Sequence, residues 1–307
     1  MDRPWALGRA ANEVFITGTD VQGQLIGSVE NLFTKSEGPA VGGVWVARST
    51  DGGLTFPQQV LSISNDHLLG LNSNLASGNG NLYLYYEKRV AESRFAHVVA
   101  VSKDSGLTWS HKMVAEQPWD SDNCLAYPLM VFPVIAADST GGVFITWVAA
   151  NPETHRADLF FAASPDEGEH WSAPVLVTDR PGTRLYPWLA TDAQGQVGMA
   201  WYESNKTLYP RHVTNTAERA SCTWGESEPV DWFLHYASIS APLSQNPQSV
   251  ETLAQPDPVT RTPFLGRPFA ELLQVAFDPQ GKAAIAYVSD AEGASARPMF
   301  VLQAPSS

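Results

Sequence analysis

Few side chains in this sequence stand at spacings that bind a metal or a cofactor. The segment Asp120-Ser121-Asp122-Asn123 carries oxygen ligands of the kind that Ca²⁺ prefers, but it lacks the Gly and the terminal Glu of a full calcium loop. The seven His residues show no paired spacing on one strand, which argues against zinc. A Gly-x-Ser-x-Gly elbow, a phosphate-binding loop and a Cys-x-x-Cys pair are absent. We therefore expect no metal and no cofactor.

A repeated turn motif indicates the scaffold that must position any reactive side chain. An acidic residue folds its carboxylate back onto backbone N–H groups, a Gly takes a positive φ, and an aromatic residue pins the turn. We expect Asp51, Asp104 and Asp166 to be structural in this way. The three copies are Ser49-Thr50-Asp51-Gly52-Gly53-Leu54-Thr55-Phe56, Ser102-Lys103-Asp104-Ser105-Gly106-Leu107-Thr108-Trp109 and Ser164-Pro165-Asp166-Glu167-Gly168-Glu169-His170-Trp171.

A second repeat marks the start of each structural unit: a short apolar strand, a turn of the type Asp-x-x-Gly, and a strand of alternating apolar residues. The clearest copies run from Pro133 through Asp138 to Trp147 and from Pro187 through Asp192 to Trp201. Both repeats recur at intervals of about 50 to 60 residues, which is typical of a radially repeated sheet. Helical periodicity is absent, so we predict an all-β propeller of four-stranded antiparallel blades.

Five blades are visible, beginning near residues 2, 68, 128, 184 and 266. We expect residues 1–307 to form a single domain, with a polar loop insertion at about 204–231 in the fourth blade. The last repeat ends after one further strand, Arg297 to Leu302. Cys124 and Cys222 fall in different repeats, and either one disulfide or two free thiols is compatible with that spacing.

The pattern Ser-x-Asp-x-Gly-x-Thr-Trp resembles the Asp box, or BNR repeat, of sialidases and related β-propellers. The third copy departs from it where Glu169-His170 replaces the usual apolar-Thr pair. The resemblance covers nearly the whole chain. It implies a six-bladed ring, whereas five repeats are visible here, so a propeller of five or six blades is expected. It also implies that the boxes lie on the face opposite the ligand site.

Alignment of the five hairpins places one residue of each blade near the mouth of the central channel, and the residues just before them and at the ends of the second strands lie close by. The first group is Arg3, Asn72, Phe132, Tyr186 and Leu272. The residues just before them are Asp2, Leu71, Val131, Leu185 and Glu271. The strand-end group is Asp20, Lys88, Ala149, Glu203 and Ser289.

The resemblance to sialidases implies roles for some of these positions: arginines that hold a substrate carboxylate, a Tyr nucleophile activated by a Glu, and an Asp as acid/base. Asp20 would be the acid/base, Tyr186 or Tyr202 the nucleophile, and Glu203 or Glu271 its base. Substrate would be bound by Arg3, Asn72, Arg184 and Arg267, the last two in blade-connecting loops, with Arg156 and Arg211 as further candidates.

Each of these positions also has a structural reading. The family's Phe-Arg-Ile-Pro motif is replaced by Asp2-Arg3-Pro4-Trp5, and Arg3 could equally form a salt bridge with Asp2 or Glu271. The aromatic residues Tyr186, Trp201 and Tyr202 could serve only to pack the blade. The activity is therefore left open by the residues themselves.

The net charge of −13 and a pI near 4.9 argue against nucleic-acid or anionic-membrane partners, which both need a basic patch. No run of 18 apolar residues occurs, so no transmembrane helix is expected. The first residues show no signal-peptide pattern, so either the protein stays inside the cell or a leader has been removed. Of these we expect a secreted or extracytoplasmic protein.

Two functions follow as hypotheses. The first is a sialidase-like propeller that binds, and in its stronger form hydrolyses, glycans at one face; it predicts that at least three Arg converge with a Tyr and a carboxylate. The second is a non-catalytic propeller that binds a small molecule or a protein, or serves as an assembly subunit. It predicts a central channel lined by apolar residues such as Leu71, Phe132 and Leu272.

Overall fold

A computed structural model gives the arrangement of the chain. It describes residues 2–19, 44–56, 61–64, 74–91, 94–118, 134–151, 156–192, 194–208, 211–215, 218–223, 230–240, 242–244, 248–254, 257–261, 273–290 and 297–302. Among the predicted site residues, Asp20, Asn72, Arg267 and Glu271 lie outside these ranges. Cys124 lies outside them as well.

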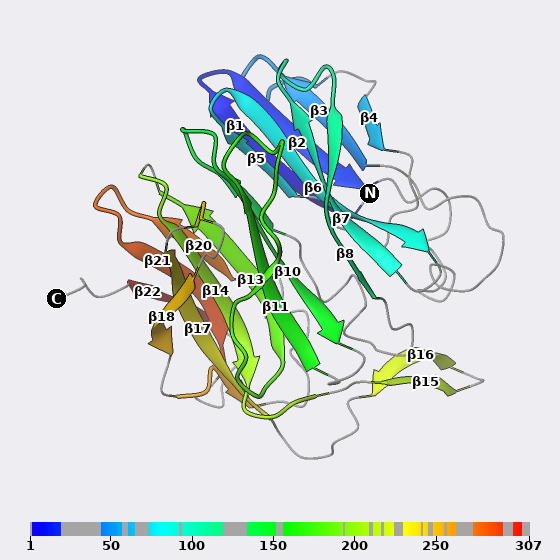
Figure 1. Ribbon diagram of the computed structural model, residues 1–307, viewed down its shortest axis with the longest axis vertical. Coiled ribbons are helices and arrows are strands. Elements are labelled where there is room, and N and C mark those ends of the chain that lie inside the picture. The colour runs from blue at the N-terminus through cyan, green and yellow to red at the C-terminus, as the bar shows by residue number, and fades with distance from the viewer. Residues whose placement is uncertain are drawn as a thin grey trace.

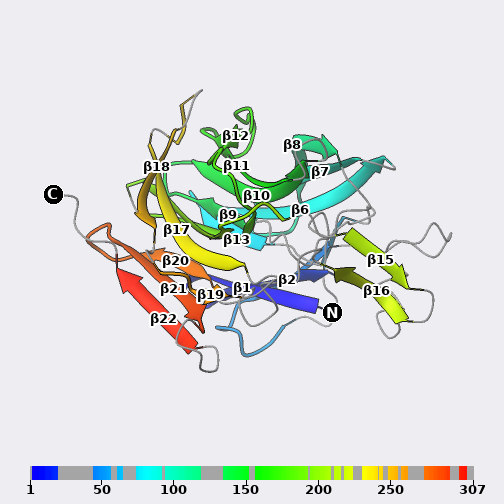
Figure 2. The same cartoon turned by 90° about the horizontal axis from the view of Figure 1, so that it is seen from below.

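Antiparallel sheets arranged as the blades of a propeller make up the fold (Figures 1 and 2). Blade 1 contains β1 (Asp2–Ala10), β2 (Glu13–Thr19), β3 (Val44–Ser49) and β4 (Leu61–Ser64). Blade 2 contains β5 (Asn74–Gly78), β6 (Asn81–Ala91), β7 (Arg94–Ser102) and β8 (Ser110–Pro118). Blade 3 contains β9 (Val134–Ala137), β10 (Val143–Asn151), β11 (Arg156–Ser164) and β12 (Val175–Leu176).

Blades 4 and 5 depart from the four-stranded pattern. Blade 4 contains β13 (Arg184–Thr191), β14 (Val197–Ser204), β17 (Asp231–Ser240) and β18 (Gln248–Ala254), with β19 (Thr260–Arg261) also paired to β17. Blade 5 contains β20 (Gln274–Phe277), β21 (Ala283–Ser289) and β22 (Arg297–Leu302). The insertion in blade 4, expected as a loop, holds a separate hairpin of β15 (Arg211–Asn215) and β16 (Glu218–Thr223), which stands apart from the blades in Figure 2.

The prediction of an all-β propeller is confirmed, and the described strands form five blades. The five repeats predicted from the sequence begin at or before the first strand of each blade. The sixth blade implied by the sialidase resemblance is therefore not needed to account for the repeats. No helix able to span a membrane occurs in the part of the chain that is described.

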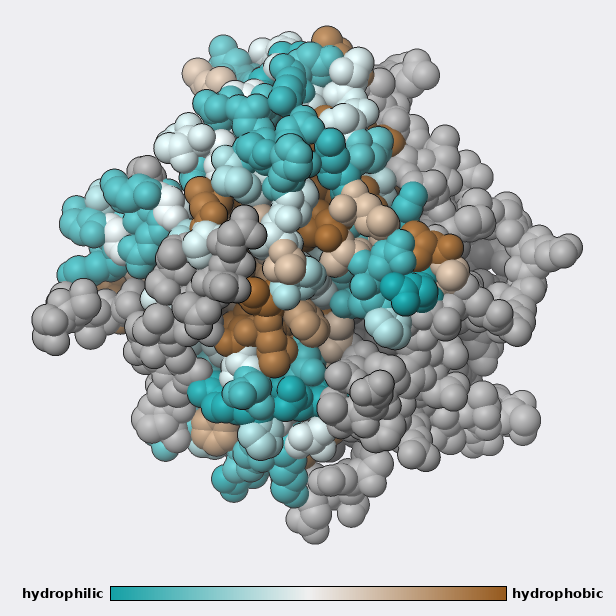
Figure 3. Space-filling view, in the orientation of Figure 1, coloured by the Kyte–Doolittle hydropathy of each residue, from teal (hydrophilic) through white to brown (hydrophobic). Residues whose placement is uncertain are grey.

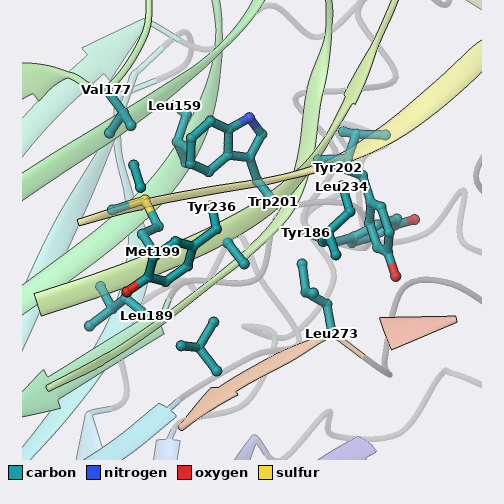
Figure 4. Packing of buried hydrophobic residues seen from close by; sticks show 14 of the residues in the cluster. Leu159, Val177, Tyr186, Leu189, Met199, Trp201, Tyr202, Leu234, Tyr236 and Leu273 are labelled. Atoms are coloured by element: carbon teal, nitrogen blue, oxygen red, sulfur yellow. The ribbon is translucent and has the colours of Figure 1, made fainter. Parts of the chain in front are cut away.

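Apolar side chains fill the seams between consecutive blades. Successive residues of a strand point to opposite faces, so the second strand of a blade packs on both neighbours. Figure 4 shows this for β14: Trp201 lies beside Leu159 of blade 3, whereas Tyr202 lies on the other side near Leu273 of blade 5. All eight residues of β14 are buried as a result. Polar and apolar side chains share the outer surface, with apolar groups gathered near the centre of the face in Figure 3.

Near the central channel, blades that are not consecutive also touch. The rings of Trp5 in β1 and Trp188 in β13 lie 5.1 Å apart between centroids. Innermost strands line the channel of a propeller, so this pair brings blades 1 and 4 together across it.

The three repeated turns share one hydrogen-bond pattern. In the first, Ser49 Oγ accepts from the Gly53 N–H at 2.9 Å, and Asp51 accepts from the Thr55 N–H at 2.9 Å and the Thr55 hydroxyl at 2.5 Å. Hydrogen bonds from Ser49 and Thr55 lower the pKa of Asp51 to about 2. In the third turn His170 takes the place of Thr, with its Nδ1 2.6 Å from Asp166 Oδ2. The aspartates thus fix the turns through local bonds.

The turns between the first two strands of blades 3, 4 and 5 repeat a second pattern. One carboxylate oxygen of Asp138 accepts hydrogen bonds from the backbone N–H groups of residues 140 and 142, both at 2.8 Å. Asp192 and Asp278 do the same with the N–H groups two and four residues further on. These turns hold the inner hairpin of each blade.

Close approach of blades 2 and 3 at Gly78 gives a first prediction. A Cβ added there would overlap the Asp138 carbonyl oxygen and lie 2.8 Å from the Ala137 Cβ. Because backbone cannot yield easily, Gly78→Ala is expected to lower the free energy of unfolding by about 1–3 kcal/mol. The control is Gly8→Ala, where nothing lies within 4 Å, and which should change it by less than about 0.5 kcal/mol. Urea unfolding of both variants tests this, and equal effects would contradict it.

Candidate functional site

Most of the predicted catalytic and binding residues whose side chains are described lie on two paired strands of blade 4: Arg184 and Tyr186 on β13, and Tyr202 and Glu203 on β14. Arg156, a further candidate, lies on β11 of blade 3. Arg3 lies on β1, where only its backbone is described. Which of the remaining candidates join this group stays a prediction.

Arg184 is the centre of a buried group of charges. It was expected in a connecting loop, but it is the first residue of β13 and lies directly opposite Glu203 across the strand pair. Its side chain is fully buried. The guanidinium donates from Nε to Glu203 Oε2 at 3.3 Å and from Nη1 to Asp158 Oδ1 of blade 3 at 3.3 Å. It also donates to the Gly182 and Arg180 carbonyl oxygens. One guanidinium therefore joins two blades.

Glu203 receives a second arginine from the connection between the blades. Arg180 donates from Nε to one carboxylate oxygen at 3.2 Å and from Nη2 to the other at 3.3 Å, a two-bond arrangement that fixes both partners. The Trp201 indole adds a bond to Oε2 at 3.0 Å. Arg180 Nη2 also lies 3.1 Å from Nδ1 of His235, whose ring stacks on Trp201. The Arg180 side chain is 42% exposed, so this arginine forms the open edge of the group.

Asp158 is held in the same way from blade 3. Arg156 stands two residues earlier on β11, on the same face, and its Nε lies 2.6 Å from Asp158 Oδ1. Its Nη1 donates to the Asp179 carbonyl oxygen at 2.9 Å. We call Arg156, Asp158, Arg180, Arg184 and Glu203 the arginine–carboxylate cluster.

Three guanidinium groups and two carboxylates make up this cluster, which leaves a local surplus of positive charge in a chain of net charge −13. Burial lowers the pKa of Arg184, while the charges of Glu203 and Asp158 act in the opposite direction. An arginine remains charged under these conditions. The cluster can therefore hold two carboxylates in fixed positions and offer a cationic edge, Arg180, to an anionic or hydroxyl-rich ligand.

The two tyrosines differ in their surroundings. Tyr186 is buried and has φ +53°, an uncommon backbone conformation for a residue other than Gly, at an irregularity in the β13–β14 pairing. Such local strain is frequent at functional sites. Tyr202 accepts a hydrogen bond from the Val288 N–H of blade 5 at 3.2 Å, and burial raises its pKa. A phenol that is harder to ionise gives no support to a nucleophile at Tyr202.

Sequence reasoning missed Asp158, Arg180 and His235. The spacing of Arg156 and Asp158 on one face of a strand was a usable signal for the first. Arg180 lies in a connection whose direction the sequence does not give, and His235 is brought in by the strand that follows the insertion. No group of three or more His, Cys, Asp or Glu able to hold a metal occurs among the residues described.

No protein-family model matches this sequence, and no curated protein is similar to it. Several solved structures share the fold. A protein of unknown function from Dyadobacter fermentans is 14% identical over 98% of this chain and 78% of its own, with a TM-score of 0.51. An α-L-arabinanase from Penicillium chrysogenum, complexed with arabinobiose, is 13% identical over 97% and 92%, with a TM-score of 0.48.

A mutant α-L-arabinofuranosidase from Fusarium graminearum, in complex with an iminosugar inhibitor, is 11% identical over 97% of this chain and 91% of its own, with a TM-score of 0.46. At these identities the likeness concerns the fold alone. What this chain does must therefore be argued from its own residues.

Removal of the buried guanidinium gives a second prediction. Arg184→Met leaves Asp158 and Glu203 enclosed with one cation fewer, and breaking a buried ion pair typically costs about 3–5 kcal/mol in the free energy of unfolding. Arg261→Met is the matched control, because Arg261 is 67% exposed and pairs with Asp231 at the surface. It should cost less than about 1 kcal/mol. Urea unfolding measures both, and a loss of equal size in the two variants would show that the cluster is not strongly coupled.

Proposed function

We propose that this protein is a glycan-active propeller that binds a sugar chain at the arginine–carboxylate cluster and hydrolyses a glycosidic bond there. The observation that carries the proposal is the pair of carboxylates, Asp158 and Glu203, held from two blades by one buried guanidinium. Glycoside hydrolysis commonly uses two carboxyl groups that flank the scissile bond. The arrangement supplies two such groups at positions that their ion pairs keep fixed.

The arginine–carboxylate cluster lies at the end of the blades where a binding surface for a sugar chain could form. β11 runs from Arg156 at the cluster to Ser164, where the third repeated turn begins. The cluster and the repeated turns therefore stand at opposite ends of the blade. Loops at the end away from such turns are free to vary and to form a binding surface.

In this proposal Asp158 and Glu203 are the reacting carboxyl groups, Arg180 binds the sugar, and Arg184 positions both carboxylates. Further residues expected on the same face would extend the sugar site: Arg3, Asn72 and Arg267 as binding residues, and Asp20 and Glu271 as additional carboxyl groups. The finer proposal is a sialidase-like reaction, with Tyr186 as nucleophile, Glu203 as its base and Asp20 as acid/base. The convergence of Arg156, Arg180 and Arg184 supports a sugar that carries a carboxylate. An extracytoplasmic location is proposed with it.

Hydrolysis of a panel of fluorogenic glycosides tests the proposal and gives the third prediction. The wild-type protein is expected to hydrolyse at least one of a sialoside, an arabinoside and a xyloside. Glu203→Gln and Asp158→Asn should each lower kcat by about 100-fold or more, because removal of an acid or base typically costs 10²–10⁴-fold. The surface variant Arg261→Met should retain full activity.

Two results would remove the hydrolase proposal. One is the absence of turnover of every glycoside by folded wild-type protein. The other is full activity of both carboxylate variants. Among active outcomes, turnover of the sialoside that is lost in Arg3→Ala selects the sialidase-like form.

A non-catalytic binding module is the second candidate. Two observations favour it: both oxygens of Glu203 already accept bonds from Arg180, Arg184 and Trp201, and aromatic rings of Trp5 and Trp188 meet near the channel. A cluster whose groups satisfy one another can serve only to join blades 3 and 4. Binding of a glycan or protein by calorimetry without turnover, unchanged in Glu203→Gln, would select this function.

A further inference from the structure

A second polar group lies in the seam between blades 2 and 3. Glu87, near the end of β6, stands directly opposite His97 on β7. Their side chains are 4% and 0% exposed. Glu87 Oε1 lies 3.4 Å from His97 Nδ1, and the Tyr85 hydroxyl lies 2.6 Å from the same nitrogen. Three titratable groups are thus enclosed together.

Aromatic rings close this group from blade 3 and from its own sheet. The ring of Trp147 on β10 lies 4.4 Å from that of His97, and the ring of Phe95 lies 5.1 Å from it. Trp147 donates to Gln117 Oε1 at 2.9 Å. We call Tyr85, Glu87, His97, Gln117 and Trp147 the Glu87–His97 cluster.

Glu87 Oε1, His97 Nε2 and Gln117 Nε2 are buried and make no hydrogen bond of good geometry, although Gln117 lies close enough to His97 to act toward a higher pKa of the imidazole. Orphaned polar atoms are rare in folded proteins, and each calls for an explanation. All three atoms lie at the seam between blades 2 and 3. Their position indicates that the closed seam is stable with Glu87 and His97 in one protonation state and less stable in the others.

Among the side chains that are described, those that face Glu87 carry no fixed positive charge. On β7 it meets His97, and on its own strand Tyr85; Lys88 follows it and points to the opposite face. Arg89 stands two residues further along β6, where only its backbone is described. On β8 the acidic residue Glu116 pairs at the surface with Arg94. Blade 3 contributes Trp147 and apolar residues of β9 and β10 to this seam.

We propose that the Glu87–His97 cluster is a proton-operated latch, which keeps the seam between blades 2 and 3 closed while Glu87 holds its proton and releases it when that proton is lost to solvent. A protonated carboxyl group is neutral and can remain among the rings of Trp147 and Phe95. A carboxylate there would be a buried charge without a cation, which is strongly disfavoured.

The titration of the cluster fixes the sign of the effect. Burial raises the pKa of Glu87 from 4.5 to about 8 and lowers the pKa of His97 from 6.5 to about 3. In an open seam both groups regain their ordinary values. Between pH 4.5 and 6.5 the two effects cancel, because the open state has released the Glu87 proton but has bound one at His97, so the open and closed states hold the same number of protons.

From pH 6.5 to 8 only Glu87 acts, and the open fraction rises about tenfold per pH unit, or about 30-fold in all. Above pH 8 the closed state also ionises, so the rise ends. As the pH falls below 4.5 the open fraction rises again, since His97 is protonated in the open state and neutral in the closed state.

Blade 3 connects the latch to the arginine–carboxylate cluster. It packs on the Glu87–His97 cluster through Trp147, and it contacts blade 4 through Asp158, which accepts a hydrogen bond from Arg184. Opening of the seam between blades 2 and 3 would therefore loosen blade 3, which carries Arg156 and Asp158 of the arginine–carboxylate cluster. This consequence rests on the proposed function, but the latch itself does not.

Hydrogen exchange of the full chain between pH 5 and 9, corrected for the intrinsic pH dependence of amide exchange, gives the fourth prediction. Peptides from β6, β7 and β10 should show an opening that is level from pH 5 to 6.5 and rises about 30-fold by pH 8. In Glu87→Gln the rise should be absent, since the amide cannot ionise. Glu116→Gln is the control and should keep it.

The latch is overturned if the wild-type exchange stays level between pH 6.5 and 8, or if Glu87→Gln keeps the rise. An equal rise in peptides from β2 and β3 would show a global effect and overturn it too. An infrared measurement on the wild type needs no variant: the carbonyl band of a protonated carboxyl group should persist at pH 7 and disappear above pH 8. Its absence at pH 7 would refute the proposal even if Glu87→Gln fails to fold.

Discussion

Burial of each middle blade on both faces is the constraint on which the rest of this structure depends. Residues of β7 and β14 point alternately to the preceding and the following blade, and nearly all of them are buried. A polar group that enters a seam can meet only protein, so it must find its partner in the neighbouring blade or keep a neutral form. Two of the places where buried polar groups gather are the seams on either side of blade 3.

Both seams enclose a carboxyl group, Glu203 on one side of blade 3 and Glu87 on the other, and the two groups are accommodated in opposite ways. In the seam with blade 4, Glu203 stays beside arginines from the blade connection and from β13, and charge is balanced by charge. In the seam with blade 2 none of the described side chains that face Glu87 is an arginine, and burial instead moves the pKa of Glu87 to about 8. Opposed environments for carboxyl groups are a common basis for division of labour in proteins. Here they make the seam between blades 3 and 4 a candidate for ligand binding, and the seam between blades 2 and 3 a candidate for pH-dependent control of the fold.

Local bonds within the turns allow the blades to repeat without identical sequences. The third turn keeps the geometry of the first although His170 replaces Thr, because its imidazole Nδ1 lies where the threonine hydroxyl lies in the first turn. A Gly with positive φ follows the aspartate in each turn, as the left-handed backbone requires. The pattern depends on residues a few positions apart, so it survives changes elsewhere in the blade.

The amino-acid sequence by itself determined the repeats, the all-β class and the turns, since these follow from contacts between near neighbours in the chain. It also singled out Glu203 at a recurring blade position and Arg184 as a binding candidate, but it placed Arg184 in a loop and missed Asp158 and Arg180. The tertiary structure alone decided which groups meet, because the Arg184–Asp158 pair and the burial of Glu87 depend on how one blade lies against the next. Alternation along a strand predicts the face to which a side chain points. Only the packing of neighbouring blades determines whether that side chain contacts a charged group or an aromatic ring.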